Sequence, residues 1–74
     1  MARLSVEAEA GGTVTKIERR VGERVARDDL IVTIELMKME IPIVAPADGT
    51  VVKLLVAEGD HVTEGQEVAI IETA

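Results

Sequence analysis

The chain has 74 residues, no cysteine, and 14 acidic against 8 basic residues, with a formal net charge of −6. This length suits one domain but leaves no room for a catalytic cleft beside a hydrophobic core. The negative charge repels nucleic acid and anionic lipid surfaces, and no aromatic ring is present on which single-stranded bases could stack. No apolar run reaches the length of a membrane span, and the first residues do not resemble a secretory signal. We therefore expect no nucleic acid partner, no membrane and a cytoplasmic location.

In chain order, the predicted elements are short β-branched strands separated by turn residues. The expected strands lie at 13–17, around Val25, at 30–34, at 50–55, at 61–62 and at 68–72. Pro42 and Pro46 remove two backbone donors, which favours an edge strand at 41–46 over a helix. No ten-residue stretch has a helical pattern, so the sequence predicts an all-β protein.

The chain repeats itself once, at an offset of 37 residues. Residues 10–17 align with residues 47–54, and the register continues without gaps until Glu35 falls on Glu72. We expect half-repeats of about 5–35 and 42–72 within a single domain, 1–74, closing about a pseudo-twofold axis on one shared core. Gly22, Gly59 and Gly65 mark turns with positive φ, and Asp28 occupies the place of Gly65 in the first half.

The connection between the halves carries the chemistry. Residues 35–40 must reverse the chain between two apolar positions, Ile34 and Ile41, yet they contain no Gly, Pro, Asn or Asp. Lys38 stands in the middle of this connection, between Met37 and Met39. Methionine is flexible and polarizable, and it is favoured on surfaces that must fit several partners.

The motif Met37-Lys38-Met39 between two half-repeats resembles the attachment site of biotin carboxyl carrier proteins, in the short form without a protruding thumb. The resemblance covers nearly the whole chain and includes Pro42, the stretch 45–51, the stretch 58–62 and the pair 65–66. It implies a flattened β-barrel of two four-stranded sheets, known as the barrel-sandwich hybrid or hammerhead, with the lysine at an exposed turn.

By this resemblance, biotin is the covalent cofactor and Lys38 is its attachment site, with Met37 and Met39 as flanking recognition residues. The partners would be a biotin protein ligase, a biotin carboxylase and a carboxyltransferase, between which the swinging arm carries a carboxyl group. The chain itself would be a non-catalytic carrier. The acceptor stays open, with an acetyl-CoA carboxylase of fatty acid biosynthesis as one candidate.

Two other functions share this pattern. A lipoyl carrier has the same fold and turn lysine, but usually an acidic residue before the lysine and a small one after it. A non-covalent hybrid domain of efflux adaptor proteins resembles the repeat, but has no reason to keep a modifiable lysine at the tip. Leu36 departs from the small residue usual in biotin carriers, which bears on the choice of partner enzymes.

Two further features have structural interpretations. His61 has no companion ligand or nucleophile in the sequence, so we expect a structural or solvated role. The charge cluster between Glu18 and Asp29 is expected to form a solvated face, with docking of a partner as the alternative.

Overall fold

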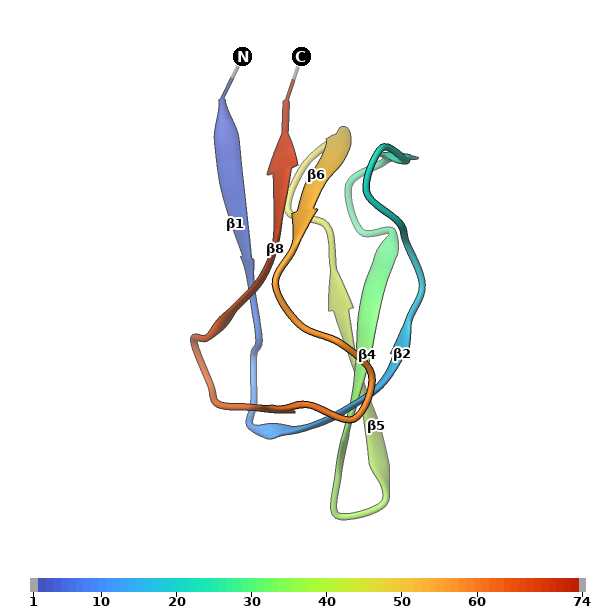
Figure 1. Ribbon diagram of the computed structural model, residues 1–74, viewed down its shortest axis with the longest axis vertical. Coiled ribbons are helices and arrows are strands. Elements are labelled where there is room, and N and C mark those ends of the chain that lie inside the picture. Colours follow the sequence, from blue (N-terminus) through green and yellow to red (C-terminus); the bar gives the residue numbers. More distant parts are fainter. Residues whose placement is uncertain (1, 74) are drawn as a thin grey trace.

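The computed structural model describes residues 2–73, which form eight β-strands and no helix (Figure 1). The strands are β1 (Arg3–Glu7), β2 (Gly12–Ile17), β3 (Arg24–Val25), β4 (Leu30–Leu36), β5 (Met39–Val44), β6 (Gly49–Leu54), β7 (His61–Val62) and β8 (Glu67–Glu72). The predicted strands are all present, with ends shifted by one or two residues, and β1 is an additional strand that sequence reasoning did not identify.

The strands form two four-stranded antiparallel sheets with the orders β1-β8-β6-β3 and β5-β4-β2-β7. The offset of 37 residues carries β2 onto β6, β3 onto β7, β4 onto β8 and β1 onto β5, so it carries one sheet onto the other. The predicted hammerhead with pseudo-twofold symmetry is thus confirmed. Each sheet takes two strands from before the β4–β5 turn and two from after it, so the halves interleave.

The core between the sheets is purely aliphatic. Its largest fully buried side chains are Ile31, Ile34, Ile43, Ile71, Val14, Val32, Val51 and Val68. The twofold mates Ile34 and Ile71 are both completely inaccessible to solvent. Ile41, on the strand after the turn, is only half-buried and packs against the edge of this core. Because the sequence contains no aromatic residue, valine, isoleucine and alanine fill the space between the sheets.

The predicted turn conformations are present. Asp28 has φ of 72° and Gly65 has φ of 84°, and Gly22 and Gly59 also lie in the left-handed region. The mates Asp28 and Gly65 donate equivalent backbone hydrogen bonds, to the carbonyls of Ala45 and Ala8, at 2.9 and 2.8 Å. The same turn therefore ties down both halves, although only one copy uses glycine.

The molecule is elongated, with extents of 37 × 19 × 18 Å. The β4–β5 hairpin protrudes at one end of the long axis, and the first and last strand ends meet at the other (Figure 1). There the Thr73 N–H donates to the Ala2 carbonyl at 2.8 Å. Strand β5 lies at the edge of its sheet, as Pro42 predicted. Nothing in residues 2–73 forms a membrane-spanning helix.

Candidate functional site

The β4–β5 hairpin closes with a turn of only two residues. Leu36 ends β4 and pairs with Met39, the first residue of β5, so Met37 and Lys38 alone reverse the chain. Their φ angles are 53° and 64°. Positive φ at both central positions is typical of the type I′ turn, whose twist matches that of the flanking strands. The sequence analysis placed the reversal in residues 35–40, and the structure narrows it to these two positions.

This turn is made from residues that do not favour it. A left-handed conformation costs an ordinary L-residue roughly 1–2 kcal/mol, and glycine or asparagine is the usual solution. Methionine and lysine have a Cβ atom, unlike glycine, and lack the short polar side chain with which asparagine forms local hydrogen bonds. The pairing of β4 with β5 next to the turn stabilises the hairpin and offsets the cost of the strained turn. Backbone strain of this kind is often found at functional sites.

The end of the hairpin is fully accessible. Every residue from Glu35 to Glu40 is exposed, and within residues 2–73 no salt bridge engages Lys38. The other two lysines, Lys16 and Lys53, lie inside β2 and β6 and are twofold mates. Lys38 is therefore the lysine that the fold presents at a chain reversal, on the end of the long axis.

The two flanking methionines leave most of their surface in solvent. Met37 is 87% exposed and Met39 is 68% exposed. Leu36 is also partly exposed, at 40%, so the tip carries a small apolar surface around the lysine. These side chains add little to the core, and their surface is available for contact with another protein.

A row of four polar side chains crosses the sheet just below the tip. Strand pairing places Glu40 opposite Glu35, Glu35 opposite Thr13, and Thr13 opposite His61. The Thr13 Oγ1 and His61 Nδ1 atoms form a hydrogen bond of 3.2 Å. His61 is exposed and has the solvated role expected of it. Sequence reasoning missed this row, although the repetition of Thr13 as Thr50 and of Glu35 as Glu72 was a signal for it.

The base of the hairpin is held by a close approach of two strands. A Cβ atom added to Gly12 would lie 2.5 Å from the backbone oxygen of Glu35 and would also overlap Ile34. Glycine therefore allows β2 to lie against β4 where β4 leaves the body of the domain. The repeat places Gly49 at the matching position against Glu72.

The chemistry available at this tip is that of a primary amine. Within residues 2–73, no three His, Cys, Asp or Glu side chains gather to hold a metal ion. An exposed amine on a four-carbon stem can be acylated, and the attached group then moves on a long flexible tether. The fold and the tip thus define a carrier-type hammerhead domain.

Comparison with known proteins identifies the family. The chain belongs to the biotin/lipoyl attachment family, whose model, described as "Biotin-requiring enzyme", matches residues 5–71. Domains of this family are carriers and not catalysts. The chain is 36% identical over 66 residues to the "Biotinylated protein TB7.3 homolog" of Mycobacterium leprae, covering 89% of this chain and 93% of that protein.

Other relatives are much longer. The chain is 36% identical over 63 residues to a "Probable dihydrolipoyllysine-residue succinyltransferase component of 2-oxoglutarate dehydrogenase complex, mitochondrial" of Schizosaccharomyces pombe, covering 85% of this chain but only 14% of that protein. The chain therefore spans only a small fraction of the length of such relatives.

The solved structures that resemble this chain likewise include a carboxylase and a lipoyl domain. Urea carboxylase of Kluyveromyces lactis superposes with a TM-score of 0.91 and 33% identity, over 97% of this chain and 6% of that one. The lipoyl domain of the 2-oxoglutarate dehydrogenase complex of Azotobacter vinelandii superposes with a TM-score of 0.72 and 32% identity, over 95% and 100%.

Proposed function

We propose that this chain is the biotin carrier of a biotin-dependent carboxylase, with Lys38 as the attachment residue. The observation that carries the proposal is a lysine at the second position of a strained two-residue turn, exposed at the end of the long axis. A biotin protein ligase would join the Lys38 amine to the carboxyl group of biotin through an amide. The biotinyl arm would then take up a carboxyl group at a biotin carboxylase and deliver it at a carboxyltransferase.

The geometry suits this work. A group tethered to a protruding tip stays at high effective concentration near both active sites and does not dilute into bulk solvent between them. The carrier supplies proximity, and the partner enzymes make and break the bonds. The carboxyl acceptor is chosen by the transferase, so acetyl-CoA, propionyl-CoA and urea are the acceptors to assay.

Lipoate is the second candidate, because the chain is also similar to succinyltransferase components and to a lipoyl domain. Two observations favour biotin. Both neighbours of Lys38 are methionine, and the superposition on the urea carboxylase is closer than that on the lipoyl domain.

The decisive experiment is intact mass spectrometry of the protein made beside biotin and lipoate ligases, with both cofactors supplied. We expect the mass increase of one biotinyl group, which Lys38→Arg abolishes and Lys16→Arg leaves unchanged. Addition of a lipoyl group instead would overturn the cofactor assignment. A streptavidin signal from Lys38→Arg would overturn the site.

We further propose that Met37 and Met39 act in recognition by partner enzymes. Burying one methionine side chain against a partner is worth roughly 1.5–3 kcal/mol, or about tenfold or more in specificity. The double variant Met37→Asp with Met39→Ala should fold normally, because both side chains are exposed, but should transfer carboxyl groups at least about tenfold more slowly. Urea unfolding and a carboxylation assay test the two halves of this prediction. An unfolded variant would mean that the methionines support the fold, and an undiminished transfer rate would remove their recognition role.

A further inference from the structure

The end of the molecule remote from Lys38 carries a second row of polar side chains, equivalent to the row below the lysine. Its members follow from the pairing of β1, β8, β6 and β3, and are Arg3, Glu72, Thr50 and Arg24. The central glutamate and threonine are the same in both rows. The outer positions differ, since Arg3 replaces Glu40 and Arg24 replaces His61. We call the two ends the arginine pole and the lysine pole.

All five arginines of this acidic protein gather at the arginine pole. Arg3 begins β1, Arg24 begins β3, and the other three, Arg19, Arg20 and Arg27, lie in the loops on either side of β3. The poles lie at the two ends of a 37 Å long axis, and exposed charges are screened within about 8–10 Å at physiological salt, so the charges near the arginines matter most. Acidic side chains of the same pole pair with two of the five arginines: Glu72 with Arg3, and both Glu23 and Asp29 with Arg19. Arg20, Arg24 and Arg27 form no salt bridge within residues 2–73.

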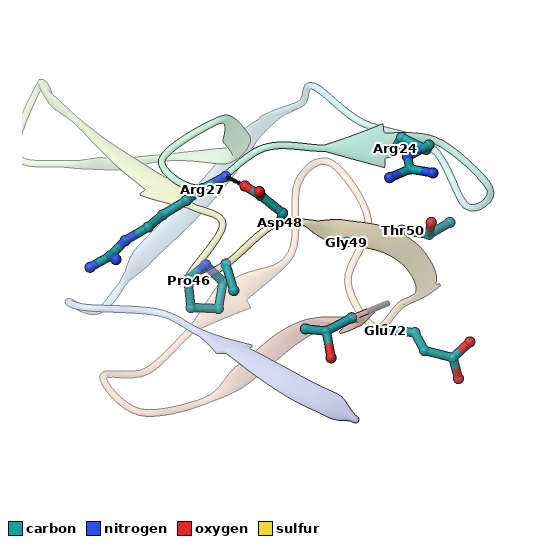
Figure 2. Close-up of a pocket in the computed structure, with 9 residues that line it drawn as sticks. Arg24, Arg27, Pro46, Asp48, Gly49, Thr50 and Glu72 are labelled. Atoms are coloured by element: carbon teal, nitrogen blue, oxygen red, sulfur yellow. Dashed lines mark hydrogen bonds between the residues drawn. The ribbon is translucent and has the colours of Figure 1, made fainter. Parts of the chain in front are cut away.

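A cleft of about 510 Å³ opens beside the row. Figure 2 shows Arg24 and Arg27 at opposite ends of it, with Pro46 and Gly49 between them. No salt bridge within residues 2–73 engages Arg24 or Arg27. Two arginines thus line the cleft without a salt bridge, next to the carboxylates of Asp48 and Glu72.

Two carboxylates also line the cleft, and each is engaged through one of its oxygen atoms. Asp48 Oδ1 accepts a hydrogen bond of 2.7 Å from the backbone N–H of Arg27, which holds the loop in place. Glu72 Oε2 accepts a hydrogen bond of 3.3 Å from Arg3 Nε. The side chains of Arg24 and Arg27, by comparison, form no salt bridge within residues 2–73, and their planar groups can bind carboxylates in pairs of hydrogen bonds.

We propose that this cleft is a docking site for an extended acidic segment of a partner protein. Two carboxylates spaced along such a segment would bind Arg24 and Arg27, while its backbone would pass over Pro46 and Gly49. The negative charge of the rest of the chain opposes long polyanions such as nucleic acid, whereas a short peptide reaches only the arginine pole. Docking here leaves the lysine hairpin, at the far end of the molecule, free to move between active sites. This inference is independent of which cofactor Lys38 carries.

The test is fluorescence anisotropy with a labelled ten-residue peptide of alternating glutamate and alanine, in 150 mM salt. The parent protein should bind the peptide with a Kd below about 1 mM, and Arg24→Ala with Arg27→Ala should weaken binding at least about tenfold. The control, Lys16→Ala with Lys53→Ala, removes the same charge from exposed strand positions and should change the Kd less than about twofold. All four residues are exposed, and circular dichroism checks that both variants are folded.

Three results would overturn the proposal. They are the absence of peptide binding to the parent at 1 mM, equal weakening by the two double variants, and equally tight binding of an oligothymidylate of the same charge. The last would make the pole a general anion surface and not a peptide site. Labelling of Lys38 should be the same in both variants, since neither pair of residues lies near the hairpin.

Discussion

The two poles of this domain are built from the same parts and differ in only a few side chains. Each has a glycine where two neighbouring strands approach closely, and a glutamate and a threonine in the middle of a polar row. Each also has a fully buried isoleucine next to the glutamate in sequence. At the lysine pole β4 continues into β5 through a strained turn, whereas at the arginine pole the equivalent strands are the first and last of the chain. The duplicated scaffold thus provides an internal control, in which the shared residues support the fold and the unshared ones mark specialised surfaces.

The largest expected effect concerns the shared core. Ile34→Ala and Ile71→Ala each remove three buried carbons from equivalent sites, and each should lower the free energy of unfolding by about 3–4 kcal/mol. Urea denaturation measures both. Costs that differ by more than about 1.5 kcal/mol would show that the two poles are not equivalent in packing.

A smaller loss is expected from the paired glycines. An added methyl group at Gly12 or Gly49 meets a backbone oxygen at 2.5 Å, so the strands must move apart, at a cost of about 2 kcal/mol each. Gly22→Ala is the matched control, because its methyl group meets nothing within 4 Å and only the positive φ is strained, which costs about 1 kcal/mol. If the free energy of unfolding falls by the same amount in all three variants, the close approach of the strands is not the reason for glycine at these two positions.

The smallest effect tests the unshared positions. Glu40 and Glu35 are like charges directly opposite each other, whereas the equivalent Arg3 and Glu72 form a salt bridge of 3.3 Å. Glu40→Arg copies the arginine pole onto the lysine pole and should raise the free energy of unfolding by about 0.5 kcal/mol at low salt, with most of the gain lost at 1 M salt. The reverse change, Arg3→Glu, should be destabilising by a similar amount. A gain that persists at high salt would mean that packing, not charge, decides these positions.

Much of the fold could be read from local pattern. Turn residues such as Gly59 and Asp28 marked the chain reversals, and β-branched runs marked the strands between them. Strand β1 was not identified, although Arg3–Glu7 alternates polar and apolar residues, because the run is only five residues long and contains a single β-branched residue, Val6. Its place in the sheet depends on pairing with β8, whose residues are at least sixty positions away in the sequence.

The candidate site likewise has one part that the sequence predicted and another that depends on the folded structure. The motif around Lys38 is local, and its position between two copies of one repeat was sufficient to single it out. The polar row of Glu40, Glu35, Thr13 and His61 joins four strands, and its counterpart at the other end joins four more. No window of sequence contains either row, and the cleft beside Arg24 and Arg27 is likewise formed only when β3, β6 and β8 meet.

From the amino-acid sequence alone follow the repeat, the all-β class and the lysine between the halves, because each depends on the order of neighbouring residues. The interleaving of the two halves, the two-residue turn under strain and the different outer side chains of the two polar rows depend on the folded chain. Strand pairing in a sheet joins residues distant in sequence, and only the register of those pairs brings Arg3 to Glu72 and leaves Glu40 facing Glu35.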